Sequence, residues 1–329
     1  MSKTEKKVSI IVPVFNEEQA LPFFLTELQE FIFSKPNLSF ELLFVNDGST
    51  DNTVEILKKH EHIGYATKII LLSKNFGSHA ASRAGLHYAT GHYATFWAVD
   101  LQYPINLIDQ LYHKCIEGAD IVWAERESTK SGLFEKFFSH IYSLLMKKFV
   151  SNDYPEKGFD TVFFNRKVID KLNQNVESNS SVLLQILTMG FQQASVCFEK
   201  QARTAGKSKW TLSKKIKLFI DSFVAFSYAP IRFVTIIGIA FFILGSMWTL
   251  YIVLRELIVG DLDPGWPALV AVLMVGFGVT NISLGIIAEY LWRTLDVSRK
   301  RPVFIIDEII EAEADKLATE ESFQKHEQQ

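Results

Sequence analysis

The chain has 329 residues, a formal net charge of −3 at pH 7 and 48% hydrophobic residues. That charge balance excludes the basic surface that a nucleic-acid-binding protein needs, so no nucleic-acid partner is expected. The two cysteines, Cys115 and Cys197, have the spacing of neither a disulfide framework nor a metal site, which suits a reducing cytosol. An early apolar run at 8–15 is too short for a signal peptide and is broken by Pro13.

Apolar runs with strand character alternate with segments of helical periodicity in the first part of the chain. Strands are predicted at 8–14, 40–45, 67–72, 93–99 and 121–123, and helices at 20–33, 52–59 and 78–89. This alternation predicts an α/β domain with a mainly parallel sheet covered on both faces. In such sheets ligands bind beyond the carboxyl ends of the strands, so the residues that follow each strand are the candidates for a site.

Carboxylates and amides follow each of the first four predicted strands. These segments are Asn16-Glu17-Glu18, Asn46 to Asp51, Lys74-Asn75-Phe76-Gly77 and Asp100-Leu101-Gln102. Oxygen ligands of this kind suit Mg²⁺ or Mn²⁺, which could hold a diphosphate. Ordinary helix capping is the alternative; it suits Asp51 and Ser78 best, whereas Asp47 and Asp100 are the stronger candidates for binding.

Two stretches near the end of the chain, 233–254 and 266–288, contain no Asp, Glu, Lys or Arg. Each has about 22 residues, which as a helix spans the roughly 30 Å hydrocarbon core of a bilayer. They predict a transmembrane hairpin, with two buried helices of a soluble core as the alternative. Arg232 before the hairpin and Arg293 and 299–301 after it place both of its ends in the cytoplasm.

Two further segments, 133–150 and 212–228, combine lysines with aromatic and aliphatic residues. Basic amphipathic helices of this type lie in the membrane interface, attracted by anionic lipid. Helices packed against the sheet are the alternative for both segments.

Several motifs resemble the nucleotide-binding half of family 2 glycosyltransferases. They are VPVFNEE at 12–18, VNDGSTDNT at 45–53, LSKNFG at 72–77 and AVDLQYP at 98–104. Others are similar to the bacterial polyprenyl-phosphate glycosyltransferases, relatives of dolichyl-phosphate mannose synthase: GFD at 158–160, RTAGKSKW at 203–210, FSYAPIR at 226–232, AEYLWR at 288–293 and RKRP at 299–302. Together they cover nearly the whole chain in the expected order.

The resemblance implies a GT-A type nucleotide-diphosphosugar domain. Residues 1–127 would form its nucleotide-sugar-binding half, 128–229 the acceptor half with interfacial amphipathic helices, 230–290 the transmembrane hairpin and 291–329 a cytoplasmic tail. The implied reaction is the inverting transfer of a single sugar, from a UDP-linked donor, to polyprenyl (undecaprenyl) phosphate at the cytoplasmic face of the plasma membrane, for cell-surface glycan modification. The resemblance also suggests a homo-oligomer, and because a hairpin of two helices is too short to carry the lipid product across the membrane, a separate flippase is expected as a further partner.

The resemblance also implies roles for individual residues. Asp47 would hydrogen-bond the nucleotide base, with Pro13, Asn16, Glu17 and Asn75 around the donor. Asp100 and Gln102 would bind the divalent ion, Asp160 would lie close to the transferred sugar, and Arg126, Arg203, Ser208 and Lys209 would contact substrate phosphate. Asp100 and Asp160 are the expected catalytic residues, with Asp160 either a general base or a group that positions the sugar.

The chain departs from the family pattern at two positions. Ala98 stands where the D-x-D metal motif has its first Asp, and Arg126 is present where relatives often have two arginines, a role that Lys130 could share. Two other functions therefore stay open. A processive glycan synthase is disfavoured by the short hairpin and the absence of a Q-x-x-R-W motif, and a catalytically silent membrane scaffold is prompted by Ala98.

Overall fold

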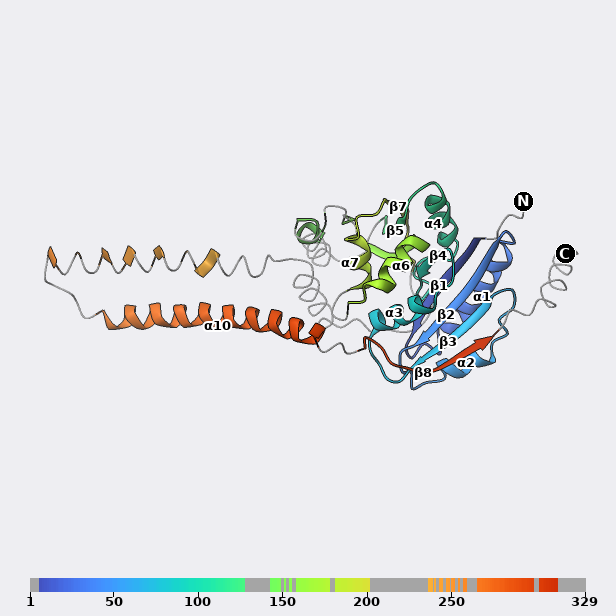
Figure 1. Cartoon of the computed structure of the whole chain (residues 1–329), viewed down its shortest axis with the longest axis horizontal. Coiled ribbons are helices and arrows are strands. Elements are labelled where there is room, and N and C mark those ends of the chain that lie inside the picture. Colours follow the sequence, from blue (N-terminus) through green and yellow to red (C-terminus); the bar gives the residue numbers. More distant parts are fainter. Residues whose placement is uncertain are drawn as a thin grey trace, which may run out of the picture. The chain divides into compact units, whose positions relative to one another are not determined.

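The chain divides into two compact units, one of residues 1–214 with 302–329 and the other of residues 215–301. The structure, a computed structural model, describes residues 6–127, 143–148, 151, 154–155, 158–177, 181–201, 265–298 and 302–312, with separate positions from 236 to 258 (Figure 1). The predicted interfacial segments lie outside the described residues, except for a helical stretch at 143–148.

The first unit is built on an eight-stranded sheet, in the order β7-β5-β6-β4-β1-β2-β3-β8. The strands are β1 (Lys6–Val14), β2 (Leu38–Asn46), β3 (Ala66–Leu72), β4 (Tyr93–Phe96), β5 (Ile121–Arg126), β6 (Phe159–Asn165), β7 (Gln193–Phe198) and β8 (Ile306–Ala312). Strands β1 to β4 are parallel to one another, and β6 runs antiparallel between β4 and β5. The predicted α/β fold with a mainly parallel sheet is confirmed, and strands from both predicted halves share this sheet.

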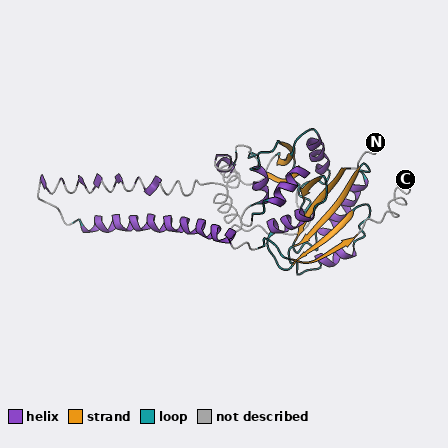
Figure 2. Cartoon of the chain, in the orientation of Figure 1, coloured by secondary structure: helices purple, strands orange, loops and turns teal. Residues whose placement is uncertain are grey.

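Helices cover both faces of the sheet (Figure 2). They are α1 (Leu21–Phe33), α2 (Thr53–Lys59), α3 (Ser78–Tyr88), α4 (Leu107–Ile116), α6 (Arg166–Gln174) and α7 (Val182–Leu187). Because side chains alternate along a strand, Ile10 packs in the core that includes Phe24 of α1, while Ile11 faces α3. Helix α3 lies close to the sheet at Gly85, where an added Cβ would be 2.4 Å from Cγ2 of Ile11.

Strand β4 is shorter than its apolar sequence predicts. The Trp97 N–H still donates to the carbonyl of Ile11, at 2.8 Å, which continues the parallel pairing by one residue. The next N–H, that of Ala98, donates instead to the phenol oxygen of Tyr103 at 2.9 Å. The chain therefore leaves the sheet three residues before the predicted end of the strand and enters a turn.

The segment after residue 301 returns to the first unit and forms β8, antiparallel to β3 at the edge of the sheet (Figure 1). The Ser73 N–H donates to the carbonyl of Ile305 at 3.0 Å, and Lys68 pairs with Glu311 at 2.7 Å. Within the segment 291–329, which was predicted as a cytoplasmic tail, residues 306–312 therefore form an edge strand of the sheet. Backbone pairing with β3 and the packing of Ile310 on the core hold this charged segment in the sheet.

The described part of the second unit contains α10 (Trp266–Ser298), which begins at the predicted start of the second apolar stretch. Many of its large apolar side chains are exposed within the chain, among them Leu269, Val272, Phe277 and Ile282. Among the described residues, none of the helices meets the length and hydropathy needed to cross a bilayer. The predicted transmembrane hairpin is thus not found there, and half of the residues of its first stretch, at 233–254, lie outside the described residues.

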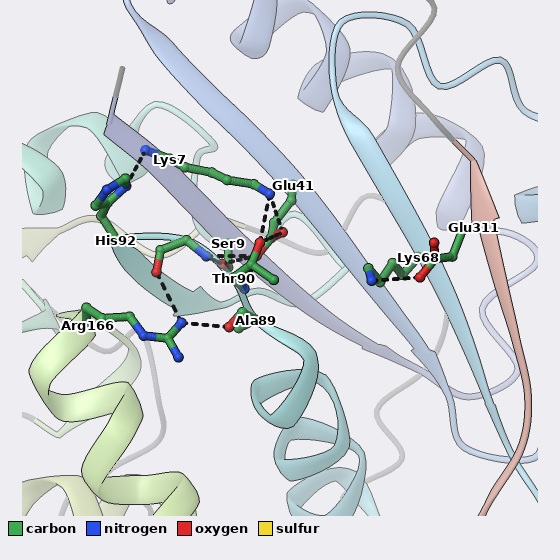
Figure 3. A network of polar contacts seen from close by, with 10 residues as sticks. Lys7, Ser9, Glu41, Lys68, Ala89, Thr90, His92, Arg166 and Glu311 are labelled. Atoms are coloured by element: carbon green, nitrogen blue, oxygen red, sulfur yellow. Dashed lines mark hydrogen bonds and ion pairs between the residues drawn. The ribbon is translucent and has the colours of Figure 1, made fainter. Parts of the chain in front are cut away.

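A buried carboxylate fixes the connection between α3 and β4, where the parallel strands begin. Glu41 of β2 is 3% exposed and accepts hydrogen bonds from Ser9, Thr90 and the Gly91 N–H, while Lys7 pairs with it at 2.7 Å (Figure 3). Burial raises the pKa of the Glu41 carboxyl, but the hydrogen bonds from Lys7, Ser9 and Thr90 outweigh it, so the pKa lies below 4.5. The network is structural and lies at the opposite ends of the strands from the candidate site.

Candidate functional site

Strand direction brings the candidate residues to one edge of the sheet. Asn16, Asp47, Asn75 and Asp100 follow the carboxyl ends of β1 to β4, which are parallel. Arg126 is the last residue of β5 and Asp160 the second residue of β6, and because these strands are antiparallel, both residues lie at that same edge. The position beyond the strand ends is where α/β sheets bind ligands.

The loops after β1 and β2 are joined by hydrogen bonds. The Asn16 N–H donates to Oγ of Ser49 at 2.9 Å, and the Asn16 side-chain oxygen accepts from the Thr50 N–H at 2.8 Å. The Glu17 N–H donates to Oγ1 of Thr53 at 2.8 Å. Asn16 adopts a left-handed backbone conformation, with φ of 51°, which Asn tolerates better than most residues. Asn16 and Glu17 are therefore held against the loop that carries Asp47.

For Asp51 and Ser78, the sequence favoured helix capping over ligand binding. Asp51 accepts hydrogen bonds from the N–H and the hydroxyl of Thr53, at 3.1 and 2.6 Å, and from the Glu18 N–H at 3.2 Å. It therefore joins the start of α2 to the loop after β1. Ser78 is the first residue of α3, and Gly77 occupies the N-cap position with φ of 95°.

Asp47 connects the loop after β2 to the loop after β3. Its two carboxylate oxygens accept hydrogen bonds from the backbone N–H groups of Phe76 and Gly77, at 2.7 and 2.9 Å. The residue is 4% exposed. Burial raises the pKa of this carboxyl, and the two N–H bonds offset only part of that effect. Sequence reasoning expected a base contact here; the observed contacts position the loop that contains Asn75. Each carboxylate oxygen keeps a second lone pair with which it could meet a nucleotide.

Pro13 lies in β1 opposite Val45 of β2, one residue before the strand ends. Gly48 allows the loop after β2 to pass close to the loop after β3. It has φ of 73°, and an added Cβ would lie 2.8 Å from the backbone nitrogen of Asn75. The predicted donor residues are therefore brought together by direct contacts between three loops.

The turn after β4 carries Asp100 and Gln102. The Gln102 N–H donates to the Asp100 carboxylate at 3.3 Å, and Leu101 between them has φ of 51°. The Gln102 carbonyl accepts from the Gln201 N–H at 2.8 Å, so the segment after β7 lies against this turn. Asp100 is half-buried at the turn.

Asp160 is held by two cations. The Arg126 guanidinium binds both of its carboxylate oxygens, with Nε 2.7 Å from Oδ2, and Lys200 Nζ lies 3.4 Å from Oδ1. This hydrogen-bonded pairing raises the pKa of Arg126. Arg126 was predicted to contact substrate phosphate, but here it holds a carboxylate. Lys200 was missed because it belongs to none of the motifs, although it lies shortly before Arg203.

Tyr103 was also missed. It lies within the AVDLQYP motif, but nothing in the sequence assigned its hydroxyl a role. Its phenol is buried, and its pKa is raised by burial and then by the negative charges of Asp100 and Asp160. Both predicted catalytic carboxylates are thus near enough to this one hydroxyl to act on it electrostatically.

The described residues fit a divalent ion only if the substrate supplies most of its ligands. No group of three or more His, Cys, Asp or Glu in this part of the chain could hold a metal. Asp100 is one carboxylate, and Asp160 is engaged by Arg126 and Lys200. Mg²⁺ commonly binds through one or two carboxylates, substrate phosphates and water, so Asp100 with a diphosphate is a compatible set. Arg203, Ser208, Lys209 and Lys130 lie outside the described residues.

Residues 9–173 match the family described as glycosyl transferase family 2. The chain is 33% identical over 307 residues to a prophage bactoprenol glucosyl transferase homolog of Escherichia coli, covering 92% of this chain and 99% of that one. It is 27% identical over 314 residues to the undecaprenyl-phosphate 4-deoxy-4-formamido-L-arabinose transferase of Yersinia pestis, covering 94% and 95%. A solved glucosyl-3-phosphoglycerate synthase from Mycobacterium tuberculosis is similar with a TM-score of 0.48 and 16% identity, over 67% of this chain and 76% of that one.

Proposed function

Because this chain belongs to glycosyl transferase family 2 and is a glycosyltransferase, we propose that it transfers a single sugar from a nucleotide-diphosphosugar to polyprenyl phosphate. The observation that carries the proposal is that the candidate residues lie together at one edge of the sheet. Further support comes from relatives named as bactoprenol and undecaprenyl-phosphate transferases, which match this chain over nearly their whole length. We propose undecaprenyl phosphate as the acceptor, a UDP-linked sugar as the donor and inversion at the anomeric carbon.

The loops after β1, β2 and β3 are our proposed site for the nucleoside. Pro13, Asn16, Glu17, Asp47 and Asn75 surround it, and the hydrogen bonds between the loops hold these residues in place before the donor binds. Preorganised loops lower the entropic cost of binding.

The diphosphate is proposed to lie beside Asp100 and Gln102. A Mg²⁺ or Mn²⁺ ion bound there would neutralise charge that develops on the departing nucleoside diphosphate. Asp100 would hold the ion, and the backbone bond between Gln102 and Asp100 would keep that carboxylate oriented.

The acceptor is proposed to enter beside Asp160, where Arg126 and Lys200 supply positive charge. A phosphate monoester is already anionic at neutral pH, so its attack requires positioning more than proton removal. Both carboxylate oxygens of Asp160 are already held by Arg126, and Lys200 lies 3.4 Å from one of them, which favours a positioning role for Asp160 over general-base catalysis. Arg203, Ser208 and Lys209 are proposed as further phosphate ligands.

The second unit is proposed to attach the enzyme to the cytoplasmic face of the plasma membrane, where a lipid phosphate is accessible. Support comes from the exposed apolar side chains of α10, which would otherwise face water. The predicted hairpin, the homo-oligomer and a separate flippase for the product belong to the same proposal.

The test is a transfer assay on the full chain, purified in detergent. Radiolabelled UDP-glucose, UDP-N-acetylglucosamine and other nucleotide sugars are each supplied with Mn²⁺ and undecaprenyl phosphate. One donor should give a product that moves into organic solvent, and the product should depend on both the lipid and the metal. A failure of every donor would refute the proposal.

Ala98 keeps a silent scaffold as the second candidate, because the first carboxylate of the metal motif is missing. Calorimetric titration with the UDP-sugars and Mn²⁺ separates the two functions, since a scaffold should neither bind nor hydrolyse a donor. Product length on a gel separates single transfer from processive synthesis.

A further inference from the structure

The turn after β4 is closed across its base by a side chain. The Tyr103 phenol oxygen accepts the Ala98 N–H at 2.9 Å, which joins the two ends of the segment that contains Asp100. Ala98 is the position at which the D-x-D motif has its first Asp. In this chain, the residue that lacks the carboxylate is therefore bound through its backbone to a tyrosine five residues later.

The Tyr103 ring is firmly held. It is 6% exposed, packs edge-on against Trp97 with ring centres 4.6 Å apart, and contacts Phe198 of β7 with ring centres 6.0 Å apart. A phenol in such packing has little freedom to turn, so its oxygen is a fixed point to which the turn attaches. Leu101 at the tip of the turn has a left-handed backbone conformation, which is unfavourable for L residues other than Asn and Asp. The hydrogen bond between Ala98 and Tyr103 helps to maintain this conformation.

The Tyr103 hydroxyl also lies in the field of both site carboxylates. The charges of Asp100 and Asp160 act on it, and after burial they are the causes of its raised pKa. The Ala98 N–H occupies one acceptor position of the phenol oxygen, which leaves the hydroxyl proton to donate to another group.

We propose that Tyr103 is a positioning residue that holds the Asp100 turn in its metal-binding geometry, in a chain whose metal motif lacks its first carboxylate. The inference rests on the proposed function for the identity of the ligand, a nucleoside diphosphate with a divalent ion. Tyr103 itself touches neither the reacting atoms nor the metal; it acts through the backbone of residues 98–103.

Tyr103→Phe is the direct test, because it keeps the ring in its packing and removes only the hydroxyl. Binding of Mn²⁺ to the full chain in the presence of UDP is followed by the electron paramagnetic resonance of free Mn²⁺, with GDP replacing UDP if UDP does not bind. The apparent Kd for Mn²⁺ should rise about tenfold, since a hydrogen bond at the base of the turn is lost. Nucleotide binding without metal should stay within about twofold and the unfolding temperature within about 3 °C of the wild type.

Tyr112→Phe is the matched control. Tyr112 lies on α4 and packs against Tyr93 at the start of β4, the opposite end of that strand from the turn. Its hydroxyl deletion should leave the Mn²⁺ affinity unchanged. Adding Tyr103→Phe to Asp100→Asn should weaken Mn²⁺ binding no further than Asp100→Asn alone, because the tyrosine acts through that carboxylate.

These measurements test the positioning role of Tyr103 independently of the proposed sugar transfer. An unchanged Mn²⁺ affinity in Tyr103→Phe, a loss of metal-free nucleotide binding, additive effects with Asp100→Asn, or no metal binding by the wild type with either nucleotide would each overturn it. A tenfold weaker Mn²⁺ affinity in a protein that transfers no sugar would uphold the positioning role and refute the proposed function instead.

Discussion

Replacing Glu41 by Gln should lower the unfolding temperature by about 6–12 °C, although the residue lies far from the site. The substitution keeps the size of the side chain and removes its charge. Glu41 is nearly fully buried and accepts hydrogen bonds from Ser9, Thr90 and Gly91, with Lys7 at 2.7 Å (Figure 3). In the variant, an NH₂ group would face at least one of these donors, so a donor would lose its acceptor.

The magnitude follows from what is lost. A hydrogen bond to a charged group contributes about 1.5–3 kcal/mol, and breaking a buried ion pair costs about 3–5 kcal/mol. Lys7 is 31% exposed, so water compensates part of the loss on that side. A destabilisation of about 3 kcal/mol is therefore expected, and a unit of this size changes by about 2–4 °C for each kcal/mol.

Glu311→Gln supplies a control with the same chemical change in an exposed pair. Glu311 binds Lys68 at 2.7 Å with its side chain 62% exposed. Such surface pairs contribute about 0.2–1 kcal/mol, so the unfolding temperature should fall by at most about 4 °C. The readout is thermal unfolding in detergent, followed by intrinsic tryptophan fluorescence. Equal shifts in the two variants would refute the reasoning about burial.

The effect of Glu41 should also depend on pH. Its folded-state pKa is lowered below 4.5, so the carboxylate stabilises the fold fully above the unfolded-state pKa. That contribution is lost as pH falls through the folded-state pKa. The difference between wild type and Glu41→Gln should thus be constant near neutral pH and shrink once the pH drops below about 4.5. A difference that grows at low pH would contradict the assigned sign.

Three further substitutions test the site. Asp100→Asn should reduce turnover by about 100-fold or more in the transfer assay while the unfolding temperature stays near that of the wild type; full activity would remove Asp100 from the site. Gly48→Ala should weaken UDP binding and lower stability by more than about 1 kcal/mol, because its Cβ would meet the loop after β3 at 2.8 Å. Gly118→Ala, also at positive φ but in open space, should leave UDP binding unchanged. Arg126→Lys cannot bind both oxygens of Asp160, so the KM for undecaprenyl phosphate should rise about tenfold with the donor KM unchanged; the reverse pattern would assign Arg126 to the donor.

The parallel part of the sheet could be predicted because each of its strands is a short, buried apolar run bounded by polar turns. The first three strands lie where the hydrophobic pattern indicates. Because these strands are parallel, the polar loops that follow them lie at one edge of the sheet. Strand β8 could not be found in this way. Three of the seven residues of the segment IDEIIEA are acidic, and its strand conformation depends on pairing with β3, more than 200 residues earlier in the chain.

The site was predictable as a set of positions but not as a set of contacts. Asp47, Asp100 and Asp160 each follow or begin a strand at the expected edge, and local sequence is enough to identify them. The pairing of Asp160 with Arg126 and Lys200 joins residues 34 and 40 positions apart, which no local pattern encodes. Tyr103 escaped notice for a related reason, since its importance lies in the backbone N–H that it accepts.

The return of the chain as β8 makes the second unit an insertion into the first, because residues on both sides of 215–301 belong to one body. A protein cut after residue 214 would lose a strand of its sheet as well as the inserted unit. The edge of β3 from Thr67 to Leu72 would then present unpaired backbone groups, a surface prone to strand-to-strand aggregation. A soluble catalytic fragment should instead join residue 214 to residue 302 through a flexible linker and keep the C-terminal strand.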